Sequence, residues 1–170
     1  MAKRPAKKIW IVVADASRAR FLSPDHELGK LVAAGPADLV APQSRQRPRE
    51  LKSDRPGRGF SSARGGVRHS FEPAHDYQKL EKHRFMAQLA QALDDARGRG
   101  AYDELVLVAP RRSLGELRGM LSKRVQGSLR EEVAKELSKV PTSQLSRRLG
   151  PAIGKRLSPP RLGRPSPAGG

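Results

Sequence analysis

Two short runs of consecutive apolar residues constrain the fold more than any other feature of this sequence. The first is IWIVVA at residues 9–14 and the second is LVLVA at residues 105–109. Neither run alternates between apolar and polar positions, which is the pattern of a strand covered on both faces. Asp15 ends the first run and Pro110 ends the second. The runs therefore predict two strands that lie side by side in a sheet with α/β packing.

Weaker patterns place further strands and helices. Residues 18–23 alternate between basic and apolar side chains and predict a hairpin partner for the first strand. Residues 31–34 predict a third strand, and the leucines of residues 114–121 predict a helix after the second apolar run. A longer helix is expected from Asp76 to the glycines at 98–100. Its predicted apolar stripe consists of Tyr77, Leu80, Phe85, Leu89, Leu93 and Ala96.

Residues 128–140 are compatible with two structures. Their leucines and valines have helical spacing, but the alternation over 131–137 also permits an edge strand. Thr142 is expected to cap a short helix that ends near Leu149. We expect a basic extension at 1–8, one α/β domain at 9–149, and a disordered basic tail at 150–170, because the tail is rich in Pro and Gly.

The charge of the chain indicates the class of its partner. Lys and Arg total 34 against 17 Asp and Glu, so the formal net charge is +17. Such an excess favours binding to a polyanion. The alternatives are a basic surface that serves only solubility, or the Arg-rich composition of a high-GC genome. The absence of cysteine excludes disulfide frameworks, Cys-ligated zinc and thiol catalysis.

The basic N-terminus and the apolar run after it resemble a secretory signal only superficially. The run of residues 9–14 is too short for a signal core and for a membrane span. We therefore predict a cytoplasmic protein with no membrane span.

Residues 41–72 are the strongest candidate for a binding segment. They show no helical or strand period, and a structureless loop of this length is usually functional or disordered. We expect it to be mobile alone and ordered on its partner. Arginine pairs bidentately with phosphate and stacks on exposed bases, which indicates RNA. The basic residues of the loop are Arg45, Arg47, Arg49, Lys52, Arg55, Arg58, Arg64 and Arg68.

Several segments together resemble a known family. They are WIVVAD at 10–15 followed by RAR at 18–20, RELKSDRPGRGF at 49–60, GGVRH at 65–69, LVLVAP at 105–110 and LGELR at 114–118. In this order they resemble the bacterial host-attachment protein family, named for a proposed role in attachment to host cells, over roughly residues 9–149. The resemblance implies an RNase-H-like α/β domain similar to the middle domain of archaeal and eukaryotic release factors and of Pelota. It also favours a strand within 128–140.

The release-factor resemblance extends to one short motif in the basic loop. In release factors a mobile loop presents Gly-Gly-Gln to the peptidyl-transferase centre, and this chain has Gly65-Gly66-Val67 in a comparable loop. Glycines let a backbone approach RNA closely, whereas valine has no amide to orient a hydrolytic water. The resemblance thus implies contact with rRNA or tRNA on the ribosome. The implied RNA-binding set is the basic residues named above together with Gly65, Gly66 and His69.

Other chemistries fit the sequence less well. A two-metal nuclease needs converging acids, but Asp103 and Glu104 precede the second apolar run whereas Asp15 follows the first. Asp15 is instead expected to cap the turn to Ser17. The histidines at 69, 75 and 83 match no standard metal-ligand spacing, and no phosphate loop or dinucleotide motif occurs, so we predict no metal or cofactor.

The sequence therefore predicts a protein that binds RNA without catalysing a reaction. One alternative is an accessory role in the attachment of bacteria to host cells or surfaces. A further alternative is hydrolysis of peptidyl-tRNA, which Val67 in place of glutamine disfavours. The oligomeric state is left open.

Overall fold

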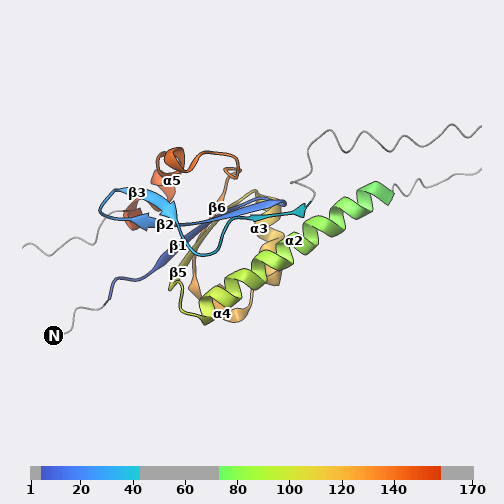
Figure 1. Ribbon diagram of the computed structural model, residues 1–170, viewed down its shortest axis with the longest axis horizontal. Coiled ribbons are helices and arrows are strands. Elements are labelled where there is room, and N and C mark those ends of the chain that lie inside the picture. The colour runs from blue at the N-terminus through green and yellow to red at the C-terminus, as the bar shows by residue number, and fades with distance from the viewer. Residues whose placement is uncertain (1–4, 43–72, 158–170) are drawn as a thin grey trace, which may run out of the picture.

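The computed structural model describes residues 5–42 and 73–157 of the chain, and these residues form a mixed α/β fold. A six-stranded sheet has the order β3-β2-β1-β5-β6, and β4 pairs with β2 (Figure 1). This arrangement confirms the predicted fold class of a mixed sheet flanked by helices. The strands are β1 (Ile9–Ala14), β2 (Arg18–Asp25), β3 (Lys30–Ala33), β4 (Leu39–Val40), β5 (Glu104–Ala109) and β6 (Leu129–Ala134).

The two apolar runs form the centre of the sheet. β1 and β5 are parallel neighbours, with Ile11 opposite Val106 and Val13 opposite Val108. Every residue of β5 is buried, as expected for strands covered on both faces. The predicted hairpin and third strand are confirmed too, because β2 pairs antiparallel with both β1 and β3.

Helices cover both faces of this sheet. α2 (Pro73–Gly98), α3 (Arg111–Met120) and α4 (Lys123–Ser128) lie on one face, and α5 (Thr142–Leu157) lies on the other (Figure 1). Successive strand residues point to opposite faces. Within β1, Val12 therefore packs toward α2 and α3, whereas Ile11 and Val13 pack toward α5.

The predicted apolar stripe of α2 is confirmed only in its C-terminal half. Phe85, Leu89, Leu93 and Ala96 are buried, but Tyr77 is 56% exposed and Leu80 is 46% exposed. Their assignment to the stripe is therefore wrong. The physical reason is the step of five residues from Leu80 to Phe85, which rotates a helix by about 500° and so leaves Leu80 ~140° away from the buried face.

Polar contacts anchor the same C-terminal half of α2 to α4. Asp94 accepts hydrogen bonds from Arg124 Nε at 2.9 Å and Arg124 Nη2 at 2.7 Å, and the Ser122 hydroxyl donates to it as well. These bonds from Arg124 and Ser122 lower the pKa of Asp94 below its usual value. The helix is therefore held near its end, close to where β5 begins.

Within residues 128–140 a strand forms over residues 129–134, as the family resemblance suggested. β6 runs parallel to β5, with Val133 opposite Val108. The helical interpretation of residues 129–134 is therefore wrong, and the short helix α4 ends at Ser128 just before the strand.

The helix that begins at Thr142 is longer than the sequence predicted. α5 continues to Leu157 instead of ending near Leu149. Ile153 is 1% exposed and packs in one core with Leu145 and Leu149, at spacings of four residues. This packing explains why residues 150–157 are helical and do not belong to a disordered tail. Residues 43–72 of the predicted basic loop at 41–72, and the remaining tail at 158–170, lie outside the described residues.

The turn between β3 and β4 gives a test of how closely the core is packed. Gly35 has a φ of +67°, and a Cβ there would lie 2.4 Å from Trp10 Cη2. Gly29 has a φ of +61° but no atom within 4 Å of such a Cβ. We expect Gly29→Ala to lower the free energy of unfolding by about 1 kcal/mol, the cost of the backbone conformation. Gly35→Ala should cost about 3 kcal/mol because overpacking adds to that cost.

Urea unfolding of the two variants measures this difference. An equal loss of stability for Gly29→Ala and Gly35→Ala would show that the indole of Trp10 moves aside freely and that the packing is loose.

Candidate functional site

The candidate site lies at the edge of the sheet where the parallel strands end. β1, β5 and β6 point the same way, so their carboxyl ends share one edge. The turn after β1 and the start of α3 after β5 meet there. Ligands of open α/β sheets bind outside this edge.

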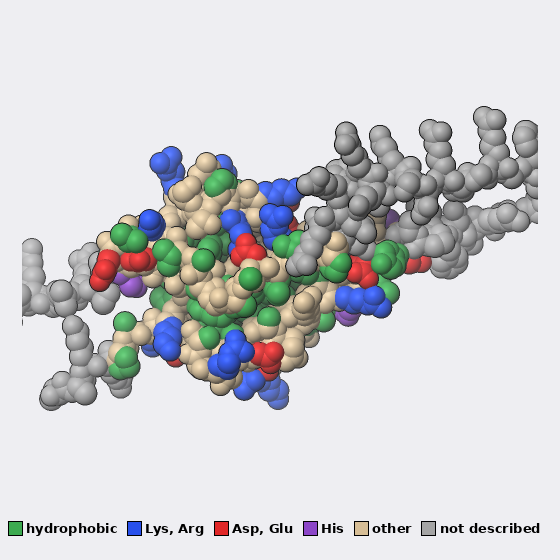
Figure 2. Space-filling model, in the orientation of Figure 1, with side chains coloured by type: hydrophobic (Ala, Val, Ile, Leu, Met, Phe, Trp, Pro, Cys, Tyr) green, Lys and Arg blue, Asp and Glu red, His purple; other side chains and the backbone are tan. Residues whose placement is uncertain are grey.

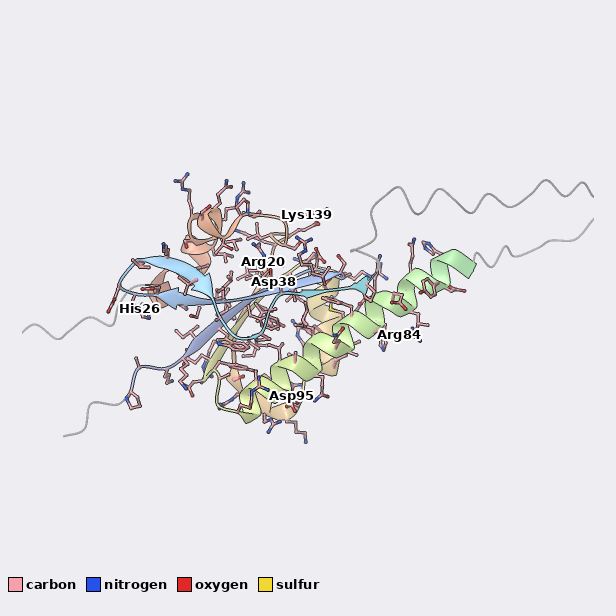
Figure 3. All side chains as sticks on the ribbon, in the orientation of Figure 1. Arg20, His26, Asp38, Arg84, Asp95 and Lys139 are labelled. Atoms are coloured by element: carbon pink, nitrogen blue, oxygen red, sulfur yellow. The ribbon has the colours of Figure 1, made fainter. Side chains whose placement is uncertain are left out.

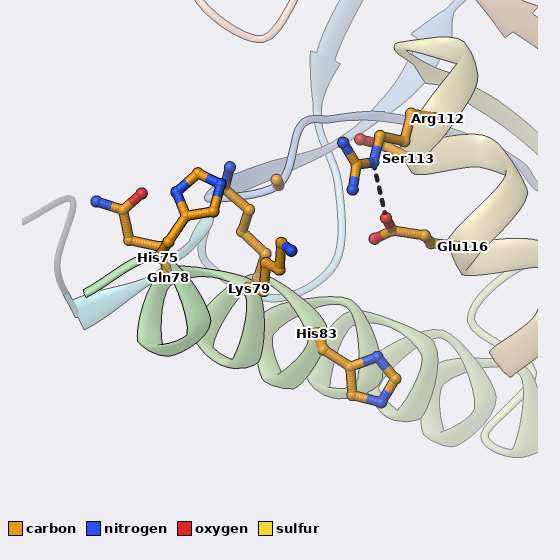
Figure 4. A pocket seen from close by; sticks show the side chains of 9 residues that line it. His75, Gln78, Lys79, His83, Arg112, Ser113 and Glu116 are labelled. Carbon is orange, nitrogen blue, oxygen red and sulfur yellow. Dashed lines mark hydrogen bonds and ion pairs between the residues drawn. The ribbon is translucent and has the colours of Figure 1, made fainter. Parts of the chain in front are cut away.

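A cleft of about 280 Å³ opens at this edge, between the first half of α2 and the first turns of α3 (Figure 4). Figure 4 shows His75 and Lys79 of α2 across from Arg112 and Ser113 of α3. Ala16, in the turn after β1, completes the wall. The lining residues are Ala16, His75, Gln78, Lys79, Lys82, His83, Arg112, Ser113 and Glu116.

The helical period explains why α2 presents these polar side chains to the cleft. Spacings of three and four residues place Gln78 and Lys82 on the same helical face as the buried Phe85 and Leu89. This inward face is thus apolar where α2 covers the sheet and polar and basic where the helix extends beyond the sheet (Figure 1).

The charges of the cleft are unbalanced. Lys79 and Lys82 form no hydrogen bond or ion pair with another described residue. Arg112 Nε lies 3.3 Å from Glu116 Oε1 one turn further along α3. Three cationic side chains therefore share one carboxylate, and the lining attracts anions.

The first turn of α3 adds to this positive charge. Pro110 precedes the helix without a side-chain cap, and the first turn holds no acidic residue. The first N–H groups of a helix lack intrahelical acceptors and carry partial positive charge. Ser113, in this turn, is 7% exposed, and its hydroxyl forms no hydrogen bond with another described residue.

The turn after β1 is fixed by one carboxylate. Asp15 Oδ1 accepts hydrogen bonds from Ser17 N at 2.7 Å, Ser17 Oγ at 2.9 Å and Arg18 N at 2.8 Å, which confirms the predicted cap. Burial alone raises the pKa of Asp15. The polar hydroxyl of Ser138 nearby and the hydrogen bonds from Ser17 and Arg18 outweigh this effect, so that the pKa lies below its usual value.

The acids at the other end of the sheet have partners of their own. Glu104 pairs with Lys7 at 2.9 Å and with Arg130 at 3.3 Å, and Asp103 accepts from the backbone of Lys8. Since Glu104 lies opposite Ile9, the first residue of β1, these acids and Asp15 are at opposite edges. They do not converge on one site.

The residues predicted to bind RNA all lie in 43–72, outside the described part of the chain. Of the histidines considered as ligands, His75 and His83 line the cleft. Residues 5–42 and 73–157 contain no group of three His, Cys, Asp or Glu side chains that could hold a metal ion. Over the same ranges, no helix is long and apolar enough to cross a membrane. The cleft was not predicted from the sequence. The change from apolar to basic residues along one face of α2 indicates a polar surface there, but it does not indicate which element lies opposite.

Fold and sequence together assign the chain to a class and then to a family. The described residues form an open, mixed α/β sheet flanked by helices. The model of the family described as "Protein required for attachment to host cells" matches residues 10–149. The chain therefore belongs to this family, which confirms the resemblance found in its motifs. A search of curated protein sequences gives no significant match.

Two of the solved structures that match this chain are described as archaeal. A crystal structure of an archaeal translation termination factor is 13% identical, with a TM-score of 0.42. A second structure, described as an archaeal protein, is 14% identical, with a TM-score of 0.39. Each match covers 88% of this chain but only 39% of the archaeal chain.

The hydrogen bonds of Asp15 predict how stability depends on pH. Asp15→Asn keeps one acceptor oxygen but removes the charge, so we expect it to be less stable than the native chain near pH 7. Because the pKa in the folded state lies below the usual 3.8, the advantage of the ionised carboxylate is present above that value. It is lost as the pH falls through the folded pKa.

Urea unfolding of both proteins at about pH 7 and about pH 3 tests this expectation. The difference in stability should shrink at the lower pH. A difference of the same size at both values would show that the charge of Asp15 contributes nothing to the turn.

Proposed function

We propose that this protein binds structured RNA without catalysing a reaction, with rRNA or tRNA on the ribosome as its partner. The observation that carries the proposal is the excess of 34 Lys and Arg over 17 Asp and Glu. RNA presents phosphates at regular spacing, and binding that neutralises them releases counterions.

The surface of the described residues supports this proposal. Six ion pairs involve basic side chains, but many exposed cations have no acidic partner among the described residues. Figure 2 shows Lys and Arg distributed over the face drawn, both over the sheet and over the helices. These unpaired cations include Arg18, Lys30, Lys79, Lys82, Arg99, Arg111, Lys123, Lys139 and Arg147.

The basic cleft lies close in sequence to the basic loop. The described chain stops at residue 42 and resumes at residue 73, and His75 already lines the cleft. The loop residues proposed to grip phosphate are those between Arg45 and His69 named above. Gly65 and Gly66 would permit close approach of the backbone, and Val67 lacks the amide that hydrolysis of peptidyl-tRNA requires. The loop therefore fits a binding role better than a hydrolytic one.

A second candidate function comes from the description of the family, which names attachment to host cells. In that case the protein would act as an accessory to attachment. Fractionation of the source cells separates the two proposals, since a protein that attaches cells directly must occur at the cell surface, whereas a ribosome-bound factor must sediment with ribosomes. Peptidyl-tRNA turnover by the purified protein would support the hydrolytic alternative instead.

Replacement of loop arginines tests the proposed RNA contact. The variant Arg55→Ala/Arg58→Ala/Arg64→Ala/Arg68→Ala should bind rRNA fragments and tRNA more weakly. If all four side chains contact phosphate, the slope of log K against log salt should become shallower by about 3. Filter binding across a salt series gives both quantities.

A matched control removes four exposed cations elsewhere: Lys30→Ala/Arg99→Ala/Lys139→Ala/Arg147→Ala. This control changes the net charge equally and should leave most of the RNA affinity intact. Equal weakening by both variants would mean that only the overall charge matters. In co-sedimentation with bacterial ribosomes, saturation near one protein per ribosome at moderate salt supports the ribosomal partner, and unsaturable binding lost at physiological salt contradicts it.

A further inference from the structure

We propose that the cleft between α2 and α3 is a binding site for a single phosphate group. The site consists of Lys79 and Lys82 on α2, and of Arg112, Ser113 and the first backbone N–H groups on α3. It involves none of the residues of the basic loop.

The first argument is the set of donors. The ammonium groups of Lys79 and Lys82, the guanidinium of Arg112 and the N–H groups of the first turn of α3 all donate hydrogen bonds and none of them accepts. A phosphate has several acceptor oxygens and no need of an acceptor on the protein. The side-chain oxygens of Gln78 and Glu116 also line the cleft and can accept, but three cations against one carboxylate favour an anion such as phosphate over a neutral ligand.

The second argument is Ser113. Its side chain is more than nine-tenths buried, it lines the cleft, and its hydroxyl has no partner among the described residues. An anion at the start of α3 would give this hydroxyl an acceptor, so Ser113 adds an uncharged donor to the cationic groups of the cleft.

The third argument is the repulsion that the empty cleft contains. The cationic face of α2 lies opposite Arg112 and opposite the positive end of α3 (Figure 4). Like charges that face each other across a cleft destabilise the structure. Glu116 offsets only part of this charge, because it is the one carboxylate of the lining and is already paired with Arg112.

The phosphate can come from RNA or from a small phosphorylated molecule. As the site of an RNA phosphate the cleft rests on the proposed function. As the site of a free phosphate it does not. The experiment has one arm for each source.

The first arm titrates the full-length protein with inorganic phosphate at constant ionic strength and follows backbone amide resonances by NMR. The amides of residues 111–114 should shift and saturate. In Lys79→Ala/Lys82→Ala the affinity should fall by about fivefold or more, since two partly exposed charge contacts are lost. The control Lys30→Ala/Lys139→Ala removes the same charge away from the cleft, with Lys139 on the α5 side of the sheet (Figure 3), and should bind as the native chain does.

A variant that should bind phosphate more tightly shows that a loss of affinity in the other variant is not the result of misfolding. Glu116→Gln removes the competing carboxylate and frees Arg112, so it should bind inorganic phosphate about two- to fourfold more tightly. Shifts that do not saturate, shifts spread evenly over the surface, or equal weakening in the cleft and control variants would overturn the site. So would unchanged or weaker binding by Glu116→Gln.

The second arm uses RNA. If inorganic phosphate at saturation weakens RNA binding, and Lys79→Ala/Lys82→Ala weakens it as well, the cleft holds a phosphate of RNA. If the first arm succeeds and RNA affinity is unchanged in this variant, the site stands and a small phosphorylated molecule is its ligand. If the native chain binds no RNA at all, the proposed function fails while the phosphate site is judged on the first arm alone.

Discussion

The parallel pairing of β1 with β5 is the constraint on which the rest of the structure depends. Ile11, Val12 and Val13 are fully buried, and every residue of β5 is buried or nearly so. Such strands are stable only when helices cover both faces of the sheet. The chain must also cross from the end of β1 back to the start of β5, and α2 is the element that makes this return. One pairing therefore determines both the layers of the fold and the edge at which the chain leaves the sheet.

The length of α2 then creates the cleft. β5 has six residues and spans about 20 Å, whereas α2 has 26 residues and spans about 39 Å. Only part of the helix is needed to cover the sheet. Its C-terminal end lies close to the start of β5 in the chain and is bonded to α4 through Asp94 and Arg124. The N-terminal part of α2 therefore extends past the carboxyl edge of the strands. The start of α3 lies at that same edge.

These relations explain what the sequence predicts well and what it does not. Continuous apolar runs identify β1 and β5 because few other structures bury every residue of a short segment. The end of α5 was misjudged because Gly150 and Pro151 are typical helix terminators, and the packing of Ile153 outweighs them. The cleft was not predictable from single residues, since Lys79, Lys82 and Arg112 each resemble an ordinary solvated cation. They can be assigned to one surface only once the fold shows where α2 extends beyond the sheet.

The part of α2 that extends beyond the sheet has polar and charged side chains on its inward face. An apolar face continued beyond the sheet would lie open to water, which costs free energy. Gln78 and Lys82 avoid this cost because they remain hydrated. The cationic side chains of this part of α2 face the positive start of α3. The arrangement is therefore stable in water but most stable with an anion between the two helices. A ligand bound only by the folded form stabilises it in proportion to its occupancy. The charge that keeps this part of α2 soluble is thus the charge that makes it a binding surface.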